Sequence, residues 1–139
     1  MVSFEKVVRK FQQLDEYLEI LSGISNTPRE TFLKDKVVIG SAKYYLQVSI
    51  ECCLDVANHI IASEKLRAPN DYADSFMVLQ EKGIVSPEFG NKLRQMAKFR
   101  NRLVHLYAEV EDAYVFEYIA EELRDFKEFK SIIIKRYKT

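Results

Sequence analysis

The sequence contains little glycine or proline, with four Gly and three Pro among 139 residues. This scarcity excludes turn-rich β-sandwiches and barrels. No apolar run approaches the ~18–20 residues of a membrane span, so we expect no membrane association. Positive and negative charges are also balanced, at 21 each, which excludes a polybasic nucleic-acid coat. Any nucleic-acid binding must therefore come from local segregation of charge.

Cysteine is scarce too, and the only two, Cys52 and Cys53, are adjacent. On a helix their side chains point about 100° apart, which strains a bridge between them. Neither has a Cys or His partner at metal-ligand spacing. We therefore predict buried, reduced thiols and no metal or other cofactor. The first residues are charged and lack the apolar run of a signal peptide, so we expect a cytoplasmic protein.

Apolar residues make up 47% of the chain and recur mostly at helical spacing. The pattern predicts helices over residues 3–21, 36–66, 72–82, 86–107 and 112–137, with a short turn or helix at 27–34. A chain of this length fits one compact unit, which we take as a single domain over residues 1–139. The predicted fold class is all-α, an up-and-down bundle of about five helices.

The segment from Lys36 to Leu66 is apolar on more than one face. A helix with this pattern is buried on several sides. In a domain this small, we expect a central helix that is shared between the bundle core and a subunit interface. This expectation favours a homodimer.

Charge is segregated in one place, the stretch that ends in Arg100-Asn101-Arg102-Leu103-Val104-His105-Leu106-Tyr107. No acidic residue occurs from Phe89 to Ala108, and five cations lie there: Lys92, Arg94, Lys98, Arg100 and Arg102. A phosphodiester site needs fixed positive charge together with a group that moves a proton near neutral pH. Arg100 and His105 supply these two, and the candidates for binding RNA are Lys98, Arg102 and Arg94.

Helix geometry places a condition on such a site. Arg100 and His105 are five residues apart and point roughly 140° from each other on an ideal helix. Either the helix ends or distorts here, or the Arg100 side chain bends across, or a second subunit completes the site. The acidic run Glu109–Asp112 indicates a helix break near Tyr107. The alternative explanation for the cluster is structural, because basic residues suit the C-terminal end of a helix dipole. His59, with apolar neighbours and no nearby cation, is predicted to be structural.

The string from Phe99 to Tyr107 resembles the Arg-polar-X-X-X-His motif of HEPN-domain proteins. It is most similar to the HepT branch, which are toxin partners of small MntA-type nucleotidyltransferases. The stretches 46–61 and 75–84 also resemble that family's middle helices. Leu106 is a departure, since many relatives carry Asp there, but this position would point away from His105.

The resemblance implies a HEPN-like helical dimer with metal-independent endoribonuclease activity on tRNA or mRNA, its site at the dimer interface. Arg100 would hold the scissile phosphate, and His105 would be general base or acid in the attack of the ribose 2′-hydroxyl. Asn101 would orient the His or the phosphate. Tyr107 would be adenylylated by an MntA-like nucleotidyltransferase antitoxin, which silences the toxin.

Two other functions are weighed against this one. In the first, the chain is a non-catalytic subunit that binds a nucleotide or docks a nucleotidyltransferase, using the same Arg, His and Tyr. In the second, it is a purely structural bundle. Glu51, which faces inward in its helix, is interpreted as the partner of a buried base, with a role in the site as the alternative.

Overall fold

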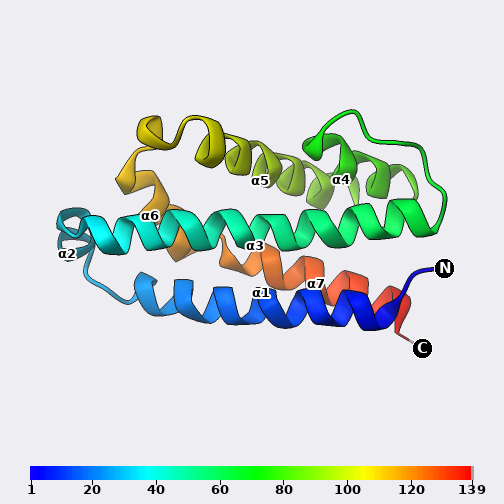
Figure 1. The fold of residues 1–139 in the computed structure, drawn as a ribbon, viewed down its shortest axis with the longest axis horizontal. Helices are drawn as coiled ribbons and strands as arrows, with labels where there is room; N and C mark the ends of the chain where they lie inside the picture. Colours follow the sequence, from blue (N-terminus) through cyan, green and yellow to red (C-terminus); the bar gives the residue numbers. More distant parts are fainter. Residues whose placement is uncertain (139) are drawn as a thin grey trace.

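The computed structural model describes residues 1–138, and every regular element in this range is helical. The elements are α1 (Phe4–Ser25), α2 (Arg29–Lys34), α3 (Lys36–Ser63), α4 (Tyr72–Glu81), α5 (Pro87–His105), the 3₁₀ turn η1 (Tyr107–Glu109), α6 (Asp112–Glu121) and α7 (Leu123–Tyr137). α1, α3, α5 and the α6–α7 pair alternate in direction along the long axis (Figure 1). The prediction of an all-α, up-and-down bundle is confirmed, but the predicted number of about five helices was too low.

The helices begin where the sequence provides caps. Ser3, Asp35, Asp71 and Ser86 each precede a helix and accept a backbone N–H of its first turn. Gly83 lies just beyond the end of α4 with φ of +79°, the left-handed conformation that glycine adopts without strain. These local signals explain why most helix ends fall within a few residues of their predicted positions.

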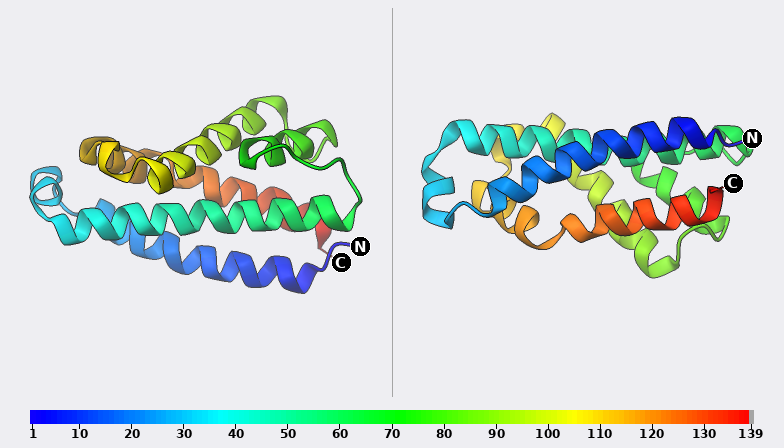
Figure 2. Two further views of the ribbon diagram at one scale, coloured as in Figure 1. Left: turned by 45° about the horizontal axis from the view of Figure 1, so that its top comes forward. Right: turned by 90° about the horizontal axis from the view of Figure 1, so that it is seen from below.

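α3 is the central helix of the bundle. It packs against α1, α2, α4, α5, α6 and α7, and its buried residues lie on several faces. Figure 2 shows it between α1 on one side and α4 and α5 on the other. Cys52 and Cys53 are free and buried in it, as predicted. The predicted burial on several faces is confirmed, whereas a role of α3 in a subunit interface stays a prediction.

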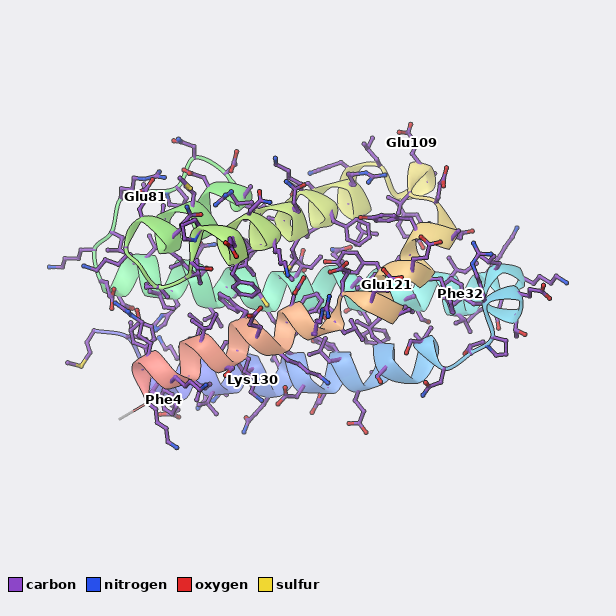
Figure 3. All side chains as sticks on the ribbon, turned by 180° about the vertical axis from the view of Figure 1, so that it is seen from behind. Phe4, Phe32, Glu81, Glu109, Glu121 and Lys130 are labelled. Atoms are coloured by element: carbon purple, nitrogen blue, oxygen red, sulfur yellow. The ribbon has the colours of Figure 1, made fainter. Side chains whose placement is uncertain are left out.

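The last predicted helix is two helices. Glu122 separates them, with φ −107° and ψ −1°, and the N–H of Asp125 bonds its carbonyl in a tighter, three-residue turn. Glu121, labelled in Figure 3, marks the end of α6 at this bend. The bend lets α7 pack Phe126 and Phe129 into the core. No glycine or proline marks the position, so the apolar stripe predicted one continuous helix.

His59 ties the N-terminus to α3. Its Nε2 accepts the backbone N–H of Ser3 at 3.0 Å. Burial, with the nearby positive charges of Lys6 and the N-terminal ammonium, lowers the pKa of His59. The predicted structural role fits these contacts, but the prediction of no nearby cation was wrong. Among residues 1–138, no helix combines the length and apolarity needed to cross a membrane.

Candidate functional site

α5 carries Arg100, Asn101 and His105. It begins at Pro87 behind the Ser86 cap, buries an apolar stripe that runs to Leu103, and stays α-helical through His105. The helix therefore neither ends nor distorts between Arg100 and His105. The two side chains leave it on faces roughly 140° apart, as on an ideal helix.

Arg100 points toward α3 and α4. Its Nε and Nη2 donate to Oε2 of Glu51 at 2.9 Å and 2.6 Å, and its guanidinium lies 4.8 Å from the ring centre of Tyr72. Its Nη1 donates to Oδ1 of Asn101 at 3.3 Å. Only 14% of the Arg100 side chain is exposed. Glu51 is thus the partner of a buried base, as interpreted, and that base is Arg100 itself.

His105 is the last residue of α5 and is exposed. Within the described part of the chain, its imidazole has no hydrogen bond or ion pair. The Arg100 side chain does not bend across to it, because Glu51 holds the guanidinium on the other side. One chain therefore keeps these two side chains apart, since α5 stays helical between them and Glu51 holds the Arg100 side chain on its own side. Completion of the site by a second subunit stays a prediction.

Tyr107 begins η1, directly after the end of α5, where the sequence predicted a break. Lys43 of α3 lies beneath it: its Nζ is 4.4 Å from the ring centre and donates to the Tyr107 carbonyl at 3.3 Å. The same ammonium pairs with Asp112 at 3.3 Å, and only 6% of the Lys43 side chain is exposed. The phenol remains about half exposed, at 49%. This arrangement fixes the backbone of Tyr107 and leaves its ring accessible.

The three cations predicted to bind RNA lie in different settings. Lys98 is exposed and forms no ion pair within residues 1–138, and the Arg102 guanidinium lies 5.9 Å from the ring centre of Tyr114. Arg94 donates instead to Oε1 of Gln80 at 2.5 Å and is half-buried against α4. Lys98 and Arg102 are thus brought together with Tyr114, while Arg94 faces another helix.

Sequence reasoning missed Lys43 and Tyr72. The sequence did contain a signal for Lys43. It is a charged residue on the face of α3 that also carries the buried, apolar Ile39 and Leu46. Tyr72 had no such signal, since its contact with Arg100 depends on how α4 packs against α5. In the described residues, no group of three or more His, Cys, Asp or Glu side chains is arranged to hold a metal ion.

The chain matches known proteins over nearly its whole length. An mRNA nuclease HepT of Shewanella oneidensis is 26% identical over 133 residues, which cover 96% of this chain and 92% of that protein. A tRNA nuclease HepT of Aphanizomenon flos-aquae is 25% identical over 130 residues, covering 91% and 87%. The structure of the tri-AMPylated Shewanella oneidensis HEPN toxin in complex with MNT antitoxin superposes with a TM-score of 0.86 at 26% identity, covering 93% of this chain and 96% of that one. Residues 14–133 match the family model described as ribonuclease HepT-like. Since this match spans most of the chain, the protein belongs to the ribonuclease HepT-like family.

Proposed function

We propose that the protein is a metal-independent endoribonuclease toxin of a toxin–antitoxin pair, with tRNA or mRNA as substrate. The observation that carries the proposal is the Arg100–His105 motif on an unbroken α5, in a chain whose relatives are named mRNA and tRNA nucleases. A fixed guanidinium and an exposed imidazole are the two groups that RNA cleavage by the 2′-hydroxyl requires.

In the proposed reaction, the ribose 2′-oxygen attacks the phosphorus and the bond to the 5′-oxygen breaks. His105 takes the proton of the 2′-hydroxyl or gives one to the 5′-oxygen, water carries the other of these two protons, and Arg100 stabilises the negative charge that develops on the phosphoryl oxygens. Asn101, bonded to Arg100, orients the guanidinium. The products are a 2′,3′-cyclic phosphate and a 5′-hydroxyl.

We further propose that the protein works as a homodimer with its site shared between subunits. The supporting observation is that Arg100 and His105 leave one helix on different faces and that Glu51 holds Arg100 on its side. Two-fold symmetry brings the Arg100 of one copy near the His105 of the other if the α5 helices meet. Each dimer then contains two sites.

Silencing is proposed to occur by adenylylation of Tyr107 by an MntA-like nucleotidyltransferase. Support comes from the relative that is AMPylated in complex with its MNT antitoxin, and from the exposed Tyr107 phenol. Lys43 lies against this ring and provides a positive charge for the added phosphate. The modification places a bulky anion two residues from His105, where it excludes RNA.

The test is cleavage of tRNA and mRNA in chelator by the protein purified alone. We expect cleavage with cyclic-phosphate ends, lost in Arg100→Ala and in His105→Ala but kept in Arg9→Ala, which removes an exposed cation of α1. Folding of each variant is checked by its melting temperature. Full activity of both Arg100→Ala and His105→Ala would contradict the assigned roles.

Mixing the two inactive variants tests the shared site. In a mixed dimer with a shared site, one site carries both defects and the other carries none. With random exchange of equal amounts, about half of the dimers are mixed and half of their sites are intact, so about a quarter of the wild-type activity is restored. A site contained within one subunit predicts no restoration, because every site then keeps one defect.

A second function is favoured by one observation, the pair of hydrogen bonds from Arg100 to one carboxylate oxygen of Glu51, which already occupies the guanidinium. If Glu51 keeps this guanidinium from RNA, the chain is a non-catalytic subunit that binds a nucleotide or docks a nucleotidyltransferase. This function predicts saturable binding of nucleotide or partner by a protein that leaves RNA intact, with Tyr107 shown to be unmodified by mass spectrometry.

A further inference from the structure

A groove lies between α5 and α6 and is closed at one end by the start of α7. Its volume is about 290 Å³, and its lining includes Gln95, Lys98, Arg102, Tyr114, Tyr118 and Asp125. We call it the Tyr114 groove. The volume is at the lower end of the roughly 300–1,000 Å³ of ligand pockets, so it suits one flat ring rather than a large ligand.

One wall of the groove is a cluster of three aromatic rings. Phe99 is buried and packs against Tyr118, with ring centres 4.6 Å apart and an angle of 33° between the rings. Tyr114 meets the Phe99 ring edge-on at 5.3 Å and 79°, and 44% of Tyr114 stays exposed. The two inner rings hold Tyr114 in place. Part of a rigid aromatic side chain is therefore left open to a stacking partner at low entropic cost.

The α5 rim of the groove carries two positive charges that form no ion pair within residues 1–138. Arg102 lies 5.9 Å from the Tyr114 ring centre, and Lys98 precedes it by one turn. Neither cation forms an ion pair anywhere in residues 1–138. His105 follows these two cations at helical spacing, so the rim leads from the groove to the proposed general base or acid.

The far end of the groove is acidic. Asp125 is 6% exposed, and Glu122 lies beside it. Burial and the hydrogen bond with Asp125 raise the pKa of Glu122. A phosphate is repelled from this end and attracted to the α5 rim. A nucleobase is uncharged, and the amino groups of adenine, guanine and cytosine can donate hydrogen bonds to the carboxylates. The charges therefore orient a nucleotide with its base inward and its phosphate on the rim.

We infer that the Tyr114 groove holds an unpaired base of the RNA next to the cleavage point, stacked on Tyr114 with its phosphates along Arg102 and Lys98. An acidic peptide fits poorly, because it offers no flat ring and meets the carboxylates of Glu122 and Asp125. Duplex RNA is excluded because its bases are stacked on each other. The inference rests on the proposed ribonuclease function, since it names the part of the substrate that the same face of α5 binds.

The experiment measures binding of a short, fluorescein-labelled, single-stranded RNA in which every ribose carries a 2′-O-methyl group, so that the attacking oxygen is blocked. We expect Tyr114→Ala to weaken binding roughly 5- to 150-fold, the range for loss of one base–aromatic stack. Tyr114→Phe keeps the ring and stays near wild type. Tyr44→Ala, which removes an exposed tyrosine of α3, serves as the matched control and leaves binding unchanged.

Arg102→Gln provides a second variant that tests the rim. The slope of log affinity against log salt is expected to fall by about 0.7, the value for one lost phosphate contact on a single strand. Arg9→Gln, at an exposed cation on α1, keeps the wild-type slope. An unchanged slope in Arg102→Gln would overturn the placement of phosphates on this rim.

Cleavage kinetics on unmethylated RNA separate this inference from the proposed function. A raised KM in Tyr114→Ala with wild-type cleavage intact supports both. Binding that depends on Tyr114 without any cleavage keeps the groove and overturns the ribonuclease. Cleavage with unchanged binding and KM in Tyr114→Ala overturns the groove alone, and no binding of RNA by the wild type overturns both.

Discussion

The ion pair between Arg100 and Glu51 allows a quantitative test of how firmly the fold holds the proposed phosphate-binding group. The perturbation is a double-mutant cycle of Glu51→Gln, Arg100→Gln and the combined variant, which isolates the coupling free energy between the two side chains. The shortest distance in the pair is 2.6 Å, with Arg100 14% and Glu51 31% exposed. The pair therefore lies between the surface and the interior.

The expected magnitude follows from that position. Exposed ion pairs contribute about 0.2–1 kcal/mol, whereas breaking a fully buried pair costs about 3–5 kcal/mol. Arg100 is mostly shielded and donates two charge-assisted hydrogen bonds to Glu51, but Glu51 keeps part of its hydration. We expect a coupling free energy of about 1–2 kcal/mol.

The chain supplies a matched control in the pair of Lys130 with Asp15. It has the same 2.6 Å distance, but its side chains are 37% and 49% exposed; Lys130 is labelled on α7 in Figure 3. Urea unfolding at one fixed protein concentration measures both cycles, so that any self-association contributes equally. For Lys130 and Asp15 we expect a coupling of roughly 0–1 kcal/mol that shrinks further in high salt.

Equal coupling free energies in the two cycles would contradict this expectation. Burial would then not strengthen the Arg100–Glu51 pair, and the fold would not hold Arg100 in a fixed direction. Arg100 could then turn toward His105 of its own chain. This result would remove the main structural support for a site shared between subunits.

Three further predictions follow from buried groups. Lys43→Met keeps the side-chain volume but loses the contacts to Asp112 and to the Tyr107 carbonyl, so we expect a loss of about 1–2 kcal/mol of stability in urea and faster amide exchange at Tyr107. Folding lowers the pKa of His59, so the unfolded chain binds a proton before the folded chain does as the pH falls below about 6.5. The free energy of unfolding should therefore decrease from pH 7.5 toward pH 5, and it should decrease less in His59→Asn. Burial raises the pKa of Cys52 to about 11 and also raises that of Cys53, so Ellman's reagent at pH 8 should label neither thiol in the folded protein and both in urea.

Local signals in the sequence explain most of the fold. Apolar spacing and the caps at Ser3, Asp35, Asp71 and Ser86 mark most of the helices, because periodicity and capping act within one or two turns. The bend at Glu122 was missed for the same reason. No residue within its own turn differs from ordinary helix sequence, and the contacts of α6 and α7 with α1 and α3 come from distant parts of the chain.

The candidate site was predictable in composition and not in geometry. The acid-free stretch before Tyr107 predicted where phosphate chemistry would occur, since charge segregation is a property of the sequence itself. The partners of Arg100 and Tyr107 come from α3, 49 and 64 residues earlier in the chain. Contacts over this separation depend on tertiary packing, which explains why the role of Lys43 was missed although its core-face position was visible.

The continuity of α5 also explains why the motif is spaced as it is. If one chain were to join its own Arg and His at one phosphate, a spacing of three or four residues would place both on one helix face. A spacing of five turns the two side chains roughly 140° apart, so that they flank the helix. Two such helices that meet about a two-fold axis face each other with an arginine from one and a histidine from the other. The five-residue spacing, which weakens a site within one chain, is thus compatible with the proposed site shared by a symmetric pair of chains, and the mixed-variant cleavage assay tests this proposal directly.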